Sequence, residues 1–289
     1  MKKLLFLVLI SAIMVWGCSA LVYVSDTGQL MKAREDAPLL PSNLFTTNNS
    51  GKMPDVSNDN KWVAFTRSPD DKVVYRKMDG SLEKVLTQKG SWPRWSPNGD
   101  RILFWDQDQN KRYIYKIMGE TLTEYNLPGD YGHDWWNSET VVYGRKTGSS
   151  APGEDVGLYL FEISTTNDIG PFLPCRYPVV SRDGKLMACE LPLSLAAVTY
   201  HIIKIYNVPS LSLKSTITFA RVPNVPSIWN VGGFSFSGDN QRLLFSATPP
   251  NETQREIYSV NVDGTDIERL STITGNDIQP SGYYKRCPW

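Results

Sequence analysis

Histidine is scarce in this chain, and its distribution limits the chemistry that the side chains could perform. The 289 residues include only two histidines, His133 and His201. A metal site that needs several imidazoles therefore has too few ligands within one chain. His133 is followed directly by Asp134, and a histidine beside a carboxylate is a candidate acid and base near neutral pH. An enzyme built on this pair would be, for example, a hydrolase or lyase acting on sugar or peptide.

The sequence lacks the short motifs by which common active sites are recognised. It contains no Gly-x-Ser-x-Gly, no glycine-rich phosphate loop and no His-Glu-x-x-His. Residues 106–110 alternate oxygen-bearing side chains as a calcium loop does, but Lys111 stands where the sharp turn needs glycine, and Ile117 where a bidentate glutamate is needed. We therefore expect a solvated loop there, no metal site and no cofactor.

Any site must be positioned by the repeats that run through the chain. In the clearest copy, residues 93–104, Ser-Pro-Asn-Gly predicts a type I turn that joins the two strands of a hairpin. The turn serine, or an asparagine in its place, recurs at positions 57, 96, 137, 181 and 237, in steps of 39, 41, 44 and 56 residues. This spacing is typical of the four-stranded blades of a propeller.

The two termini complete the pattern only when they are taken together. Residues 279–283 begin like a further repeat and stop, whereas residues 21–28 resemble the second hairpin of a blade. We expect each terminus to supply half of a sixth blade, because pairing the first and last strands removes two free sheet edges. The sequence thus predicts an all-β fold, a six-bladed β-propeller of four-stranded antiparallel blades.

These repeats resemble the WD-like repeats of the TolB-type six-bladed propellers. Residues 93–104, 178–189 and 257–271 carry the resemblance most clearly. It implies the propeller fold and leaves the activity open, because such propellers serve as docking platforms, as accessory domains of peptidases and as enzymes. The chain leaves no room for the small α/β domain that precedes the propeller of TolB, so the particular partners of TolB are not carried over.

The N-terminus has the composition of a bacterial lipoprotein signal. Three residues with two lysines precede an apolar run, Leu4 to Val15, and Gly17 stands directly before Cys18. We expect residues 1–17 to be the signal peptide and Cys18 to be lipidated, which leaves residues 18–289 as a single propeller domain on a membrane anchor. The alternative is an uncleaved anchor, since the mostly apolar stretch 4–24 is about long enough to span a bilayer.

The expected location follows from this signal. Ser19, next to the lipidated cysteine, resembles the residue that directs Gram-negative lipoproteins to the outer membrane, where the propeller would face the periplasm. Basic and acidic residues number 30 each, with no long block of one sign. Nucleic-acid binding is therefore not expected.

Three cysteines remain after lipidation: Cys175, Cys189 and Cys287. Cys175 and Cys189 fall nearly opposite one another across one predicted hairpin, and an exported protein could oxidise them to a disulfide. The alternative is that Cys189 is a small buried apolar residue, because it replaces the phenylalanine of other repeats. With the disulfide, Cys287 is left unpaired.

A propeller would bring the candidate binding residues to its central channel. The first strand of each blade lines this channel, so we expect the residues just before each repeat turn, and the loops leading into them, to gather at one mouth. Charged groups between aromatic walls are typical of binding sites and interfaces. The candidates are Trp92, Arg94, His133, Asp134, Trp135, Arg176, Tyr177, Trp229 and Asp277.

Two interpretations of this set remain open. In the functional one, the chain is a non-catalytic envelope lipoprotein that binds an envelope protein or a small envelope ligand at the mouth. In the other, the tryptophans pack between blades and the charged residues pair with one another along a water-filled channel. An enzyme at the mouth, or an accessory propeller docked beside a separate catalytic chain, are the alternative functions.

Overall fold

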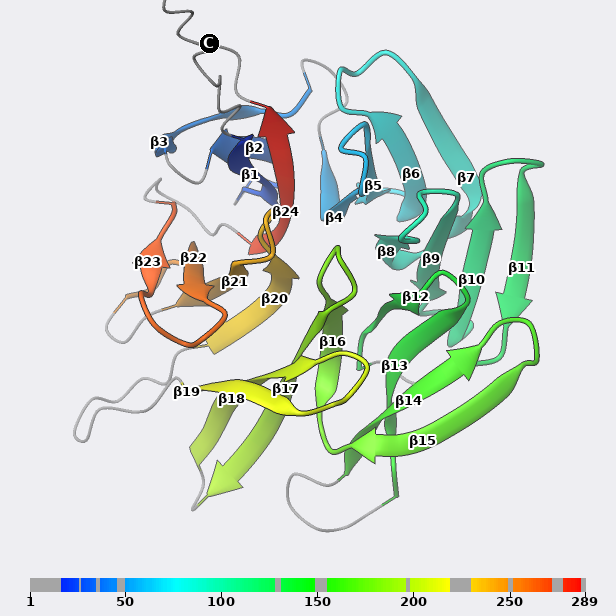
Figure 1. Cartoon of the computed structure of the whole chain (residues 1–289). Coiled ribbons are helices and arrows are strands. Elements are labelled where there is room, and N and C mark those ends of the chain that lie inside the picture. Colours follow the sequence, from blue (N-terminus) through cyan, green and yellow to red (C-terminus); the bar gives the residue numbers. More distant parts are fainter. Residues whose placement is uncertain are drawn as a thin grey trace, which may run out of the picture.

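The fold is that of a closed ring of β-sheets (Figure 1). The computed structural model describes residues 17–25, 27–34, 37–45, 50–127, 131–148, 155–195, 198–218, 230–248, 252–271 and 278–286. Trp229, Asp277 and Cys287, named above as candidates, lie outside these ranges. Within them the chain forms six four-stranded antiparallel sheets, as predicted, and no helix that could cross a membrane is found there.

Each of the first five blades takes its four strands in sequence order, with the first strand innermost (Figure 1). Blade 1 comprises β4 (Gly51–Val56), β5 (Trp62–Arg67), β6 (Lys72–Lys77) and β7 (Glu83–Lys89). Blade 2 comprises β8 (Ser91–Trp95), β9 (Arg101–Asp106), β10 (Lys111–Lys116) and β11 (Thr121–Tyr125). Blade 3 comprises β12 (His133–Asn137), β13 (Thr140–Lys146), β14 (Val156–Glu162) and β15 (Asn167–Leu173).

The remaining blades continue around the ring. Blade 4 comprises β16 (Arg176–Val180), β17 (Leu186–Leu195), β18 (Val198–Asn207) and β19 (Leu213–Thr218). Blade 5 comprises β20 (Asn230–Phe236), β21 (Arg242–Thr248), β22 (Glu256–Asn261) and β23 (Glu268–Arg269). Blade 6 comprises β24 (Ile278–Arg286), β1 (Gly17–Val24), β2 (Leu30–Arg34) and β3 (Ala37–Asn43).

Blade 6 closes the ring with strands from both ends of the chain, as predicted, but the division differs from the expected halves. The C-terminus supplies one strand, β24, and the N-terminus supplies three. β24 and β1 pair antiparallel from Gly17 opposite Arg286 to Val24 opposite Ile278. Residues 21–28, which resemble a second hairpin, are therefore the end of the second strand and the turn that follows it, and both β2 and β3 lie beyond them.

Neighbouring blades pack face to face through apolar side chains. Ala64, Val73 and Tyr75 of blade 1 form one buried cluster with Ile102 and Phe104 of blade 2. The middle strands of a blade are covered on both sides, so they read as short continuous apolar runs rather than alternating ones. The second strand of a repeat, such as Val63-Ala64-Phe65, is therefore a short apolar run in the sequence.

The repeat turns are held by a hydrogen bond pattern that explains their sequence. In blade 1, the Ser57 hydroxyl donates to Asp59 at 2.6 Å and accepts from the Trp62 amide at 3.0 Å. Ser181 and Asp183 repeat the first contact in blade 4 at 2.6 Å. A small hydroxyl residue followed by a carboxylate therefore stabilises the sharp reversal between the first two strands.

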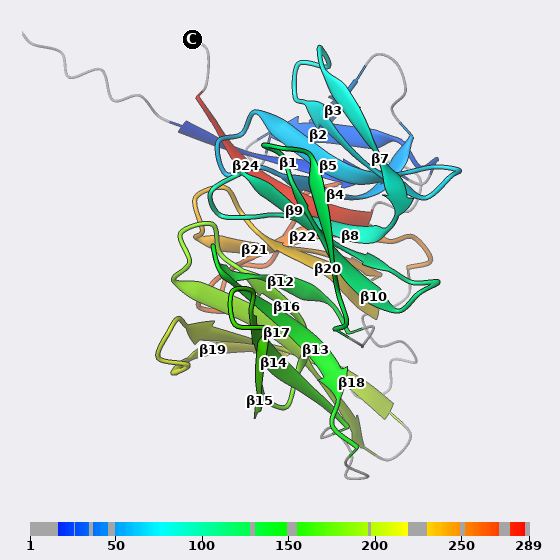
Figure 2. The same cartoon turned by 90° about the vertical axis from the view of Figure 1, so that its right-hand side faces the viewer.

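The turns define two faces of the ring. Because the strands of a blade alternate in direction, the turns between first and second strands and between third and fourth strands lie on one face, which we call the turn face. Figure 2 shows the β18–β19 turn, the start of β1 and the end of β24 on one side, and the β17–β18 hairpin on the other. The inner strands begin at that opposite face and end at the turn face.

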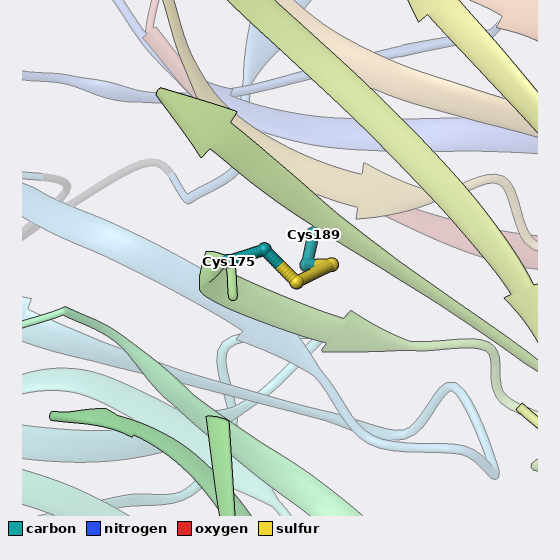
Figure 3. Close-up of a disulfide and its surroundings, with 2 residues drawn as sticks. All are labelled: Cys175 and Cys189. Carbon is teal, nitrogen blue, oxygen red and sulfur yellow. A yellow bond between two sulfur atoms is a disulfide. The ribbon is translucent and has the colours of Figure 1, made fainter. Parts of the chain in front are cut away.

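Cys175 and Cys189 form a disulfide at the opposite face (Figure 3). Cys175 directly precedes β16 and Cys189 lies in β17, and their Cα atoms are 5.9 Å apart. Both are at most 1% exposed. The bond ties the beginning of the innermost strand of blade 4 to its neighbour.

Candidate functional site: the central channel

A cavity of about 460 Å³ occupies the turn end of the central channel. Every innermost strand contributes one lining residue at the same structural position, opposite an equivalent residue of the second strand of its blade. We call these residues the channel ring: Asp55, Arg94, Asp134, Val179, Ser235 and Ser281. The repeat turns surround the mouth of the cavity, so the cavity opens on the turn face.

The charged members of the channel ring all lie on one side. Asp55, Arg94 and Asp134 come from blades 1, 2 and 3, whereas blades 4, 5 and 6 supply a valine and two serines. An Arg94 guanidinium nitrogen lies 3.8 Å from an Asp55 carboxylate oxygen. At the level of the channel ring, the cavity thus has a charged wall facing an uncharged one.

Ring residues also join one blade to the next. The Asp55 carboxylate accepts a hydrogen bond from the Trp95 amide at 2.8 Å, and that of Asp134 accepts one from the Val180 amide at 2.7 Å. Between blade 6 and blade 1, the Ser281 hydroxyl accepts from the Val56 amide at 3.2 Å. These buried backbone donors would otherwise lack a partner, so the ring has a structural role as well as a lining one.

Burial changes the acidity of the two carboxyl groups. It raises the pKa of Asp134 to about 6, against the lowering effect of Arg94 and with a further rise from Asp55. Burial likewise raises the pKa of Asp55, although Arg94 and the Trp95 amide oppose this. The charge of the polar wall therefore changes between neutral and mildly acidic pH.

Arg182 reaches across the mouth of the cavity from blade 4 to blade 1. Its guanidinium donates to the carbonyl oxygens of Val56 at 2.9 Å and Ser57 at 3.0 Å. Its own amide donates to Asn240, in the repeat turn of blade 5, at 3.0 Å. Figure 1 shows the β16–β17 connection extending into the centre of the ring. A cation thus stands at the mouth, with its guanidinium held by acceptors of blade 1 and its backbone by an acceptor of blade 5.

Sequence reasoning missed Arg182 and Asp55, although both left a signal. Arg182 occupies the second position of the repeat turn, where the clearest copy has Pro97. A long cationic side chain there is unlike the other copies. Asp55 stands two residues before its turn serine, as Arg94 does, so aligning the copies on the turn would have placed both in one layer.

The predicted set does not gather at one mouth, because its members occupy two levels of the channel. Arg94, Asp134 and Trp135 line the cavity at the turn end. Trp92, His133, Arg176 and Tyr177 lie at the beginning of the innermost strands, at what we call the bulge end. An inner strand crosses the whole thickness of the ring, so residues only two or three positions apart reach different ends.

The bulge end is named for an irregularity that recurs two residues before the channel ring. Met53, Trp92 and Tyr177 all have left-handed backbone conformations, with φ between 52° and 54°, and the strand register shifts at each of them. A bulge turns the side chain away from its regular direction. Bulky residues rarely adopt positive φ, so the surrounding structure must enforce these conformations.

Aromatic rings from neighbouring parts of the channel wall meet at this end. The rings of Trp92, in blade 2, and Tyr177, in blade 4, approach edge to face at 6.2 Å, in front of the intervening blade 3. Blade 3 makes room for them with Gly132, where an added Cβ would lie 2.8 Å from the Tyr177 Cα atom. Trp105 stacks on the other side of Trp92 at 5.6 Å. Trp92 and Tyr177, two aromatic residues of the predicted binding set, therefore pack against other rings inside the propeller.

His133 is placed as a structural residue, which removes the basis for its acid and base role. It is 2% exposed. Its Nδ1 lies 3.3 Å from the Arg112 Nε donor and its Nε2 lies 2.8 Å from the Trp92 carbonyl oxygen, so both ring nitrogens are engaged. Burial and the Arg112 charge hold the pKa of His133 well below its usual value. A neutral imidazole with both nitrogens occupied has none left for a substrate.

The other predicted residues also have partners inside the protein. Arg176 forms an ion pair at 3.1 Å with Glu190, whose side chain is almost fully buried. Trp135 is 2% exposed, and its indole N–H donates to the Arg94 carbonyl oxygen at 3.0 Å. The two arginines of the predicted set therefore form ion pairs with Asp55 and Glu190, which are not members of that set. In the part of the chain that the structure describes, no three His, Cys, Asp or Glu residues come together as metal ligands.

Comparison with known proteins identifies the architecture. No family model matches the chain, and no curated protein is similar to it in sequence. Among solved structures, TolB from Acinetobacter baumannii superposes with a TM-score of 0.69 at 16% sequence identity, covering 92% of this chain and 66% of TolB. A candidate TolB from Agrobacterium tumefaciens gives a TM-score of 0.61 at 12% identity, covering 95% of this chain and 100% of the other. The fold is that of the TolB-type six-bladed propeller.

The likeness extends to propellers from quite different proteins. A chain in the nidogen/laminin complex superposes with a TM-score of 0.65 at 9% identity, covering 93% of this chain and 100% of that one. At such identities the comparison establishes the fold alone. The chain spans slightly less than two thirds of the Acinetobacter TolB, so the activity and partners of that protein do not transfer with the fold.

Proposed function

We propose that this protein is a non-catalytic lipoprotein of the cell envelope whose propeller binds a protein segment or a small envelope ligand in the cavity at the turn end. The observation that carries this proposal is the channel ring. Six blades converge on one cavity, and one of its walls holds the charges of Asp55, Arg94 and Asp134. A cavity of about 460 Å³ is within the size range of binding pockets.

The position of the charges supports a binding role over a catalytic one. His133, the candidate base, is buried at the bulge end with both ring nitrogens engaged. The charged groups at the cavity are suited to recognising a polar ligand through paired hydrogen bonds. The occurrence of this propeller fold in a nidogen/laminin complex fits a protein partner.

The binding test compares two arginines that are alike in burial and differ in location. The Arg94 side chain is 18% exposed and lines the cavity, whereas that of Arg176 is 22% exposed and lies at the bulge end. Full-length protein, Arg94→Met and Arg176→Met would each be used to capture partners from detergent-solubilised membranes of the organism. We expect a specific partner that Arg94→Met loses and Arg176→Met retains, with thermal unfolding showing that both variants are folded.

Other outcomes of this experiment contradict the proposal in different ways. Loss of the partner in Arg176→Met alone would move the site to the bulge end. Absence of any partner, together with no thermal stabilisation by sugar or peptide libraries, would remove the support for a binding module. A catalytic chain among the captured proteins would favour an accessory propeller.

The anchor is proposed from the sequence and has its own test. Gly17 precedes Cys18 after the apolar run that ends at Val15, as in a lipoprotein signal. Cells fed with labelled palmitate should label the wild-type protein and leave Cys18→Ser unlabelled. Labelling of Cys18→Ser would place the acyl group on another residue, and membrane retention without any label would favour the uncleaved anchor instead.

A further inference from the structure

Large apolar side chains are exposed at or just before the beginning of the fourth strand in several blades. The described residues include six large hydrophobic side chains that are strongly exposed, and they come from all of blades 1 to 5. Three lie in the connection between third and fourth strands, and three within the first three residues of the fourth strand. We call them the apolar rim: Leu82, Met118, Leu122, Ile169, Leu213 and Ile267.

The apolar rim belongs entirely to the turn face. Third-to-fourth-strand connections lie on that face, and each fourth strand begins there. The turns at the other end of the same strands are polar where they are described: residues 68–71 in blade 1 and 107–110 in blade 2 carry only one apolar residue, Pro69. Single exposed apolar residues are ordinary on protein surfaces. Among the described residues, however, all the strongly exposed large apolar side chains lie at this one rim, in five blades.

The N-terminal segment leaves the propeller on this same face. β1 begins at Gly17, which pairs with Arg286, the last residue of β24, and inner strands end at the turn face (Figure 2). The apolar run of the signal ends at Val15, only two residues before the sheet. Two residues of extended chain span about 7 Å. Whether the chain is held by an acylated Cys18 or by an uncleaved segment, it has almost no spacer between membrane and propeller.

We propose that the turn face rests on the lipid bilayer, with the apolar rim in contact with the interfacial region of the membrane. This inference rests on the anchor proposed above, and it identifies the occupant of the rim as lipid rather than a protein. Contact is apolar rather than electrostatic, because opposite charges are paired along the rim, as in Lys84 and Glu120 at 2.8 Å. Anionic lipid is therefore not required. The cavity then opens toward the membrane, and its ligand approaches from the membrane side.

Two exposed positions in blade 2 provide a matched test. β10 runs between them, with Met118, 82% exposed, just after its end on the turn face, and Asp108, whose side chain is 77% exposed, just before its start on the opposite face. Met118→Cys and Asp108→Cys, each in full-length protein with Cys287→Ser, would be labelled with an environment-sensitive dye. The labelled proteins would be reconstituted in phosphatidylcholine vesicles that carry nitroxide on the acyl chains.

We expect severalfold stronger nitroxide quenching at position 118 than at position 108, with both proteins floating with the vesicles. Equal weak quenching at both positions, in protein that floats, would overturn the rim contact and leave the anchor intact. Protein that does not float would overturn both proposals. A dye at 118 that is shielded from water but not quenched by nitroxide would show that a second copy or another protein covers the rim, which also overturns the lipid assignment.

Discussion

The two ends of the channel are built from the same six strands and differ in chemistry. At the turn end, the channel ring leaves a cavity with Asp55, Arg94 and Asp134 on its wall. At the bulge end, two residues earlier in the strands, Trp92 and Tyr177 pack against each other in front of blade 3. The difference shows that polar and aromatic residues predicted to form one binding site can divide between two places, here a cavity and a packed part of the channel wall. The predictions below treat the bulge end as structural and the turn end as able to bind.

The largest effect is expected from Arg112, which supports the bulge end. It is fully buried, donates to the carbonyl oxygens of Leu127 and Gly132 and to His133, and lies 4.9 Å from the centre of the Tyr143 ring. Arg112→Met would leave two buried carbonyl oxygens without this donor, and we expect a loss of about 4 kcal/mol in the free energy of unfolding. Urea denaturation measures it. A decrease of less than about 1 kcal/mol in the free energy of unfolding, the size of an ordinary hydrogen bond, would show that Arg112 does not support the bulge end.

The disulfide is expected to have the next largest effect. It closes a loop with a sequence separation of 14 residues beside the first strand of blade 4. Replacing both cysteines, Cys175→Ala with Cys189→Ala, should lower the free energy of unfolding by about 3 kcal/mol, because the unfolded chain regains the freedom of that loop. Reducing agent should destabilise the wild-type protein and leave the double variant unchanged. Destabilisation of both by reductant would indicate a different reducible bond.

Arg182 tests the turn end with a smaller effect on stability. Arg182→Ala removes its hydrogen bonds to Val56, Ser57 and Asn60, and we expect a loss of about 1 to 2 kcal/mol. Lys185→Ala, an exposed neighbour in the same turn, should change stability by less than about 0.5 kcal/mol. Any ligand of the cavity should exchange faster in Arg182→Ala, because the side chain lies at the mouth. Unchanged ligand kinetics would place the route to the cavity elsewhere.

The fold could be predicted from the sequence because its signals are local. The turn serine, the carboxylate that follows and the apolar second strand lie within about a dozen residues. A short stretch of sequence is therefore enough to predict a blade, as is typical of repeat folds. The sixth blade was harder because its strands come from opposite ends of the chain. Pairing of Gly17 with Arg286 joins residues with no local pattern in common, so it is indicated only by the partial repeats at the two termini and by the need to remove free sheet edges.

The site was predicted in part, because contacts across the ring leave little trace in sequence. Arg94 and Asp134 are predicted from their place before the repeat turn. Arg182 is marked only by its unusual place within a turn, and the sequence does not say that it contacts blade 1 from blade 4. The depth of a residue in the channel was not foreseen either. His133 and Asp134 are neighbours in sequence, yet one is enclosed at the bulge end and the other lines the cavity.

These neighbours should respond to acid in opposite directions, which gives the finest test of the comparison. Asp134 has a pKa of about 6 in the folded protein and an ordinary value of 3.8, so folding takes up a proton between these values and the Asp134 contribution to stability rises as the pH falls from 7 to 5. The pKa of His133 is held well below 6.5, so unfolding takes up a proton and its contribution falls over the same range. Relative to wild type, Asp134→Asn should lose more stability between pH 7 and pH 5, and His133→Gln should lose less. Urea denaturation at the two pH values measures both, and the same change in both variants would show that the two ends of the channel do not differ in their ionisation.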